Sequence, residues 1–170
     1  MERREAFSDE ERAFLADARR ATLATTTPEG RPRLVPICFV VGDAPDRAGR
    51  PLLYSPLDEK PKRTDDPHRL ARVQDILVLP EASILVDRWS EDWSHLAWLR
   101  AEGTAELLEP QPHERDEHAA AVKALRAKYP QYREQAIDDR PIIRIALNRI
   151  VSWGNLVGGG RKATRRRRAT

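Results

Sequence analysis

Short apolar runs separated by turn-forming residues dominate the hydrophobic pattern of this chain. Within most runs the apolar residues fall on alternate positions, and Thr, Val, Ile and aromatic residues are frequent, which is typical of β-strands. Pro28 and Gly30 lie between the first two runs and predict a hairpin turn. The pattern predicts six strands, over residues 21–26, 31–41, 52–55, 82–87, 96–108 and 142–153.

Three further segments have the apolar spacing of helices. Ser8 and Glu11 have the spacing of a capping box at a helix start, and Asp66 followed by Pro67 is a typical start for a second helix. The helices are predicted over residues 9–19, 66–78 and 112–129. Mostly antiparallel strands interrupted by helices in this order predict an α+β fold, either a barrel or a sandwich.

The predicted strand over residues 31–41 is apolar on both faces, with Leu34 on one and Val35 and Ile37 on the other. We therefore expect both faces to be covered, one by the core and the other by a partner or ligand. Pro36 has no N–H to donate, so the segment is expected to be an edge strand or to open locally. A second apolar surface on a domain of this size predicts a homodimer.

Composition predicts one globular domain over residues 1–157 and a disordered tail over 158–170. The tail carries six cations and no acid, so removing it from the formal net charge of +3 leaves the rest of the chain at −3. Such a tail either contacts nucleic acid loosely or is a solvated end without a partner, the interpretation we favour. Cys38 is the only cysteine, and neither a signal peptide nor a membrane span is evident, so a cytoplasmic protein is expected.

Familiar catalytic and metal-binding motifs are missing from the sequence. His68, His95, His113 and His118 are scattered, and no pair has the i, i+4 spacing of a helical metal site. There is neither a Gly-x-Ser-x-Gly elbow nor a phosphate-binding glycine loop. We therefore expect no metal and no protein nucleophile, and any catalysis would depend on a bound cofactor.

A basic segment follows the predicted strand over residues 52–55. It contains Lys60, Lys62 and Arg63 and is stiffened by Pro61, while Ser55 ends the strand before it. Ammonium, guanidinium and hydroxyl groups together are good donors to a phosphate. The alternative is an ordinary solvated basic loop.

Several motifs in this order resemble the flavin-reductase-like split barrels, the pyridoxamine 5′-phosphate oxidase-like class, and specifically its deazaflavin F420-dependent branch. They are the hairpin motifs at residues 21–25 and 30–32, the run at 34–39, the basic segment at 60–63, and the runs at 82–87 and 99–105. The resemblance implies a six-stranded split β-barrel with flanking helices. It also implies a homodimer that binds cofactor in grooves between its subunits.

The resemblance also implies roles for particular residues. Lys60 and Lys62 would contact the cofactor phosphate, with Arg63 beside them and Ser55 as a hydroxyl donor. The strand over residues 33–37 would lie along the ring system, which involves Arg33, Val35, Pro36 and Ile37. Trp98, with Trp93 and Trp153, is a candidate for the ring or substrate wall, although burial in a core is the commoner role of tryptophan.

The resemblance implies an F420-dependent oxidoreductase that passes hydride from the reduced deazaflavin to a small conjugated organic acceptor. The alternatives are an FMN-dependent oxidase or reductase on the same scaffold, and a non-catalytic protein that binds flavin or haem. The chain lacks the longer Arg-Lys phosphate pattern and the C-terminal Arg-x-His motif of the flavin-using oxidases, which argues against pyridoxamine phosphate as substrate.

Overall fold

The computed structural model describes residues 6–57 and 66–157 of the chain. In these two ranges the chain forms seven strands, three α-helices and four short 3-10 helices. Their order is α1 (Asp9–Asp17), β1 (Ala21–Thr26), β2 (Pro32–Ile37), β3 (Val40–Val41), β4 (Leu52–Pro56), η1 (Pro67–Arg69), α2 (Ala71–Val78), β5 (Glu81–Arg88), η2 (Trp93–His95), β6 (Ala97–Leu108), α3 (Arg115–Lys128), η3 (Pro130–Arg133), η4 (Ile137–Asp139) and β7 (Ile142–Gly154).

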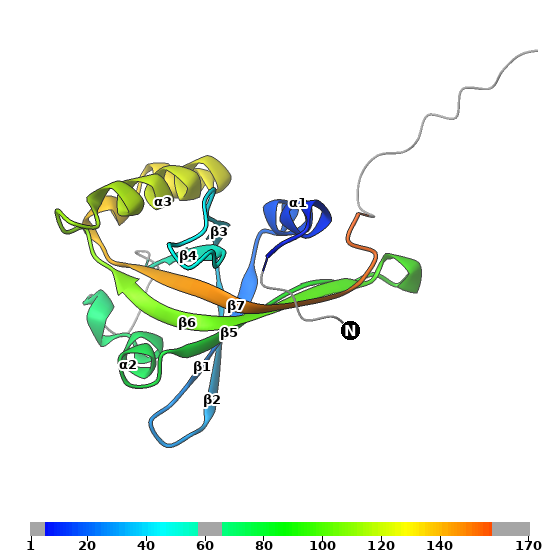
Figure 1. Cartoon of the computed structure of the whole chain (residues 1–170), viewed down its shortest axis with the longest axis horizontal. Helices are drawn as coiled ribbons and strands as arrows, with labels where there is room; N and C mark the ends of the chain where they lie inside the picture. Colours follow the sequence, from blue (N-terminus) through cyan, green and yellow to red (C-terminus); the bar gives the residue numbers. More distant parts are fainter. Residues whose placement is uncertain (1–5, 58–65, 158–170) are drawn as a thin grey trace, which may run out of the picture.

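The strands form one antiparallel sheet in the order β2-β1-β5-β6-β7-β4-β3. The sheet is strongly curled (Figure 1), and with its helices it forms the expected α+β split barrel. The expected strand count was wrong by one for the described residues, because the segment over 31–41 makes two strands. It pairs with β1 as β2, breaks at Cys38 and Phe39, and then pairs with β4 as β3.

This break closes the barrel. β2 and β3 are at opposite ends of the sheet order, yet only two residues separate them along the chain, so the two ends of the sheet must meet. At the junction the Tyr129 hydroxyl accepts a hydrogen bond from Phe39 N–H at 3.0 Å and donates one to Phe39 C=O at 2.9 Å. The hydroxyl therefore takes the place of a neighbouring strand where neither ladder continues. We call this junction, at Cys38 and Phe39, the seam.

Pro36 lies two residues before the seam, opposite Thr22 of β1. β2 is the outermost strand of the sheet, and none of the described strands lies on its side away from β1. The missing N–H of Pro36 therefore costs no hydrogen bond to a neighbouring strand on that side. The expectation of an edge strand at Pro36 is therefore confirmed.

Two hydrophobic cores lie on opposite sides of β4. The larger fills the barrel, where α1 and α2 pack over its interior and Leu53 contributes from β4. The smaller lies between the barrel and α3 and includes Val40, Tyr54 and Leu125. Successive side chains of β4 point to opposite sides, so Leu53 and Tyr54 belong to different cores. Because Tyr54 faces outward, α3 can pack against the outside of the barrel (Figure 1).

β6 and β7 form the longest antiparallel pair of the sheet, and their register shifts between Glu102 and Gly103. A Cβ on Gly103 would lie 2.2 Å from the carbonyl oxygen of Ala146, so the two backbones approach too closely there for any side chain. The extra residue at this bulge is Asn148 of β7, opposite Glu102 and Gly103. The capping box of Ser8 and Glu11 at α1 is also present, with both reciprocal bonds formed.

The segment from Asp66 to Val78 is not a continuous helix as expected. It begins as η1, capped by the Asp66 carboxylate on the N–H of His68, and α2 follows only after Leu70, whose backbone is extended. The cap and the proline favour a tight first turn, and the chain then changes direction before α2.

Lys128, at the end of α3, packs against the seam. Its Nζ donates to the carbonyl of Leu15 at 2.9 Å and lies 4.1 Å from the centroid of the Phe39 ring. Burial, reinforced by the positive charge of Arg19, lowers the pKa of Lys128 from 10.5 to about 8. Arg19 also donates to the Lys128 carbonyl and lies over the Tyr129 ring, so α1, α3 and the seam share one cluster of contacts.

Replacing Tyr129 by phenylalanine should weaken the seam. The variant leaves both backbone groups of Phe39 buried without their partner, which should reduce the free energy of unfolding by about 2–4 kcal/mol. Urea denaturation measures the loss. Tyr54→Phe is the matched control, because the Tyr54 hydroxyl has one side-chain acceptor at a cavity and should cost less. Equal losses in the two variants would contradict a special role for Tyr129.

Stability should depend on pH through Lys128. Between pH 8 and 10.5 the unfolded chain keeps the Lys128 proton that the folded chain has lost, so folding becomes more favourable as the pH rises. The free energy of unfolding of the wild type, relative to Lys128→Met, should rise by at most about 1.4 kcal/mol per pH unit in this window. Loss of the hydrogen bond to Leu15 changes the free energy of unfolding of Lys128→Met by the same amount at every pH, so it does not affect this slope. A flat difference in urea titrations from pH 7.5 to 10 would show that the folded protein keeps the proton.

Candidate functional site

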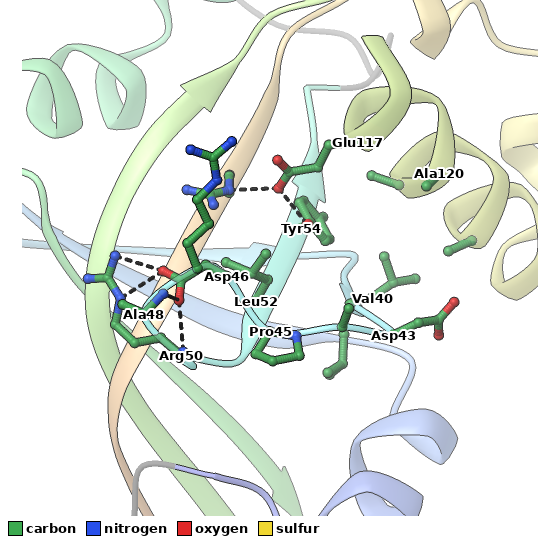
Figure 2. A pocket seen from close by; sticks show the side chains of 17 residues that line it. Val40, Asp43, Pro45, Asp46, Ala48, Arg50, Leu52, Tyr54, Glu117 and Ala120 are labelled. Carbon is green, nitrogen blue, oxygen red and sulfur yellow. Dashed lines mark hydrogen bonds and ion pairs between the residues drawn. The ribbon is translucent and has the colours of Figure 1, made fainter. Parts of the chain in front are cut away.

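A cavity of about 600 Å³ lies between α3 and the loop of residues 42–50. Figure 2 shows the side chains that surround it, which come from β3, β4, β7, α3 and this loop. Val40, Pro45 and Leu52 supply apolar surface on the side of the strands and loop. The facing side of α3 is lined by alanines at 120, 121 and 124, whose short side chains leave the space open.

Three polar side chains meet at one side of this cavity. Glu117 on α3 accepts at Oε1 from the Tyr54 hydroxyl at 2.6 Å and from Arg144 Nε at 2.7 Å (Figure 2). Arg144 also pairs with Glu106 on β6. Burial and then the bond to Glu117 raise the pKa of Tyr54, so its phenol stays protonated at neutral pH.

The loop of residues 42–50 is held by one carboxylate. Asp46 accepts from the backbone N–H groups of Ala48 and Arg50 and from the Arg50 guanidinium, at 2.8–2.9 Å. The backbone bond from Arg50 is the main reason that the pKa of Asp46 is lowered. Gly49, with φ of 81°, makes the turn that brings Arg50 back to Asp46. The rim of the cavity is therefore a structured turn.

The strand predicted to lie along a cofactor ring is β2, at the edge of the sheet. Arg33 points toward α2, where its Nε lies 2.6 Å from Oδ2 of the buried Asp75, which also accepts from the Thr25 hydroxyl at 2.8 Å. Val35 packs on the main core while Pro36 is exposed. The edge of β2 away from β1 has no strand partner in the part of the chain that the structure describes.

Ile37 and Ser55 both lie near the seam. Ile37 is the last residue of β2, directly before Cys38, and Ser55 follows Tyr54, the partner of Val40. Ile37 and Ser55 are both buried. A ligand beside β2 would therefore meet mainly its free backbone edge.

The predicted phosphate-binding residues Lys60, Lys62 and Arg63 lie outside the described residues, in the segment 58–65. This segment begins directly after Leu57, two residues beyond Ser55. Of the residues predicted to bind the phosphate, Ser55 alone is described, as a buried residue of β4.

Trp98 is not brought to β2 within one subunit. It lies on β6, three strands from β2 in the sheet order, which is about 14 Å at the usual strand spacing. Trp98 is directly opposite Trp153 of β7, and the third candidate, Trp93, is in η2 beyond the strand end. Both Trp93 and Trp153 are largely exposed.

The side of β2, β1, β5, β6 and β7 that faces away from the barrel interior carries exposed apolar residues. The register places Leu34, Leu85, Trp98 and Trp153 on this one side. Leu34 is 64% exposed, Leu85 40% and Trp153 52%. We call this surface the outer face. It is the second apolar surface that the sequence predicted for the strand over 31–41.

The polar group formed by Tyr54, Glu117 and Arg144 was not predicted from the sequence, and neither was the role of Lys128. Strand alternation beside Ser55 could have placed Tyr54 on the opposite side of β4. Glu117 lies in a helix rich in charged residues, and nothing in its neighbourhood along the chain distinguishes it from the solvent-exposed acids.

The described residues contain no group of three or more His, Cys, Asp or Glu side chains placed to hold a metal ion. His118 is buried on α3 and bonds the Arg140 carbonyl at 2.8 Å, while His68 lies between Asp66 and Glu109. None of the described helices has both the length and the apolar character needed to cross a membrane.

Several solved structures share this fold. A conserved hypothetical protein from Mycobacterium tuberculosis matches with a TM-score of 0.65 and 21% identity over 95% of each chain. A haem-binding protein from Mycobacterium smegmatis matches with a TM-score of 0.56 and 22% identity, over 88% of this chain and 55% of that one. A structure named F420 reductase has a TM-score of 0.55 and 17% identity, over 82% and 94%. At these identities the similarity shows the fold alone.

No curated protein matches the sequence. The family model described as pyridoxamine 5′-phosphate oxidase does match it, over residues 7–154. The match runs from the residue before the α1 cap to the end of β7 and includes the seam, the outer face and the cavity beside α3. The chain therefore belongs to the pyridoxamine 5′-phosphate oxidase family.

Proposed function

We propose that the protein is a homodimeric, F420-dependent oxidoreductase that transfers hydride from the reduced deazaflavin to a small conjugated organic acceptor. One observation carries the proposal. Lys60, Lys62 and Arg63 follow β4 along the chain, and β2 has a backbone edge without a strand partner among the described residues, in a chain that belongs to the pyridoxamine 5′-phosphate oxidase family. In the proposed complex these cations bind the phosphate and this edge binds the ring.

Each part of the chain has a distinct task in this proposal. Lys60 and Lys62 hold the cofactor phosphate, with Arg63 and the Ser55 hydroxyl beside it. The backbone of residues 33–37 binds the edge of the ring system, and the pair of Arg33 and Asp75 fixes this strand against α2. When bound, the deazaflavin supplies the hydride chemistry, while the protein positions the ring and excludes water.

The outer face supports the homodimer. Leu34, Leu85 and Trp153 expose apolar surface on one side of the sheet, and a second copy would cover it. Because Trp98 lies on this same side, a dimer can bring the partner's copy of it toward the β2 edge, which one subunit alone does not do.

FMN on the same scaffold is the alternative cofactor, because the family is named for an oxidase. The absence of the C-terminal Arg-x-His motif argues against pyridoxamine phosphate as the substrate.

A haem-binding role is a second alternative, because one structure of the same fold is a haem-binding protein. The two histidines with the best-defined contacts, His68 and His118, already bond protein groups away from β2. Absorption spectra of the protein titrated with F420, FMN and haem distinguish the three.

Lys62→Ala should weaken F420 binding by about 10-fold to 150-fold, since a charge-assisted contact to phosphate contributes about 1.5–3 kcal/mol. Fluorescence titration with F420 measures the affinity. Lys123→Ala is the matched control, because Lys123 is an exposed lysine on α3 that does not belong to the basic segment. Unchanged affinity in Lys62→Ala would refute the phosphate assignment. The proposed reaction itself is tested by F420-dependent turnover of enones and quinones.

The protein should sediment as a dimer at micromolar concentration, and Leu34→Glu should convert it to a monomer with weaker cofactor binding. A charge in the centre of a desolvated apolar interface is strongly unfavourable. Leu77→Glu is the control, because Leu77 is 59% exposed on α2 and does not belong to the outer face. A wild-type monomer that binds F420 with full affinity would refute the shared site.

A further inference from the structure

We propose that the cavity beside α3 is a second ligand site, which binds a small organic cation: an ammonium group on a compact apolar body. The proposal does not depend on the cofactor. The cavity lies between the outside of the barrel wall and α3 and is built by β3, β4, β7, α3 and the loop of residues 42–50 (Figure 2).

This cavity is separate from the region proposed for the cofactor. Tyr54 and Ser55 are consecutive residues of β4, so their side chains point to opposite faces of the strand. Tyr54 faces the cavity and belongs to the smaller core against α3. Leu53 and Leu57, which share the face of Ser55, belong to the main core inside the barrel. A ligand beside α3 therefore has the barrel wall between itself and the seam interior.

The size and walls of the cavity suit an apolar molecule. Its volume of about 600 Å³ is within the usual range of ligand pockets, roughly 300–1,000 Å³. Val40, Leu52 and Ala121 are buried members of the smaller core and form an apolar base for the cavity. The short side chains of Ala120 and Ala124 leave room beside them for a compact hydrocarbon group.

The charges around Glu117 decide the polar end of the ligand. Glu117 uses Oε1 for both Tyr54 and Arg144, and the structure shows no bond from its Oε2 to the described residues. Arg144 is shared by Glu117, which lines the cavity, and by Glu106, which is outside the lining and 59% exposed, so these three side chains together carry one net negative charge. The neutral phenol of Tyr54 does not offset it.

The rim does not reverse this preference. Asp46 and Arg50 pair with each other at 2.8 Å, and the two other charged side chains of the rim, Asp43 and Arg47, have opposite signs. An ammonium group can therefore donate to Glu117 Oε2, whereas a carboxylate would approach a carboxylate.

Three probes of nearly equal shape test the charge preference: 2-phenylethylamine, 2-phenylethanol and 3-phenylpropionate. Each is titrated into the full chain and followed by amide proton–nitrogen NMR. The amine should bind at least about tenfold more tightly than the alcohol or the acid, as expected for a charge-assisted bond. Its largest shifts should fall in residues 40–54 and 117–124. Equal affinities, a preference for the acid, or shifts elsewhere would overturn the proposal.

Two variants locate the site. Glu117→Gln keeps an acceptor for Tyr54 and Arg144 but removes the charge, and it should weaken amine binding about tenfold or more. Asp116→Asn removes the same charge from the adjacent α3 position, outside the cavity lining, and should leave binding unchanged. Ala120→Phe fills the cavity from an exposed helix position and should abolish binding in a protein of normal thermal stability.

The Ala120→Phe result decides the question if Glu117→Gln fails to fold. Amine binding that is unchanged in the folded variants would refute the site. F420 affinity should be the same in wild type and in Ala120→Phe, so failure of the cofactor proposal leaves this test intact.

Discussion

The bond pair between the Tyr129 hydroxyl and the backbone of Phe39 is the interaction on which the barrel depends. It lies where the chain leaves one end of the sheet and joins the other, so neither β1 nor β4 can satisfy Phe39 there. Since Tyr129 follows α3 directly, closure of the barrel and docking of the helix occur together. Lys128 and Arg19 add contacts from α3 and α1 to the same point.

Closure at this point gives β4 two different environments. One side faces the barrel interior, while the other faces α3 and the cavity at Glu117. The strand therefore separates two regions. The main hydrophobic core fills the first, and a carboxylate beside apolar residues characterises the second. A single strand can position both because successive side chains alternate.

Most elements could be predicted from the sequence because their signals are local. The capping box of α1 and the edge strand at Pro36 each depend on a few neighbouring residues. The break at Phe39 could not be predicted, because its partner Tyr129 lies 90 residues away. The contact of Tyr54 with Glu117, 63 residues apart, was missed for the same reason. Only β2 and Ser55 of the proposed cofactor site could be located, since the basic residues lie outside the described ranges.

The sequence separation of the seam has a consequence for synthesis of the protein on the ribosome. The hairpin of β1 and β2 pairs residues that are close in the chain, so it can form early. β4, however, pairs with β7, and Phe39 waits for Tyr129, so the barrel cannot close until nearly the whole domain has emerged. The edge of β2 and the apolar strands inside are unprotected during this interval, and the nascent chain is most exposed to misassembly there.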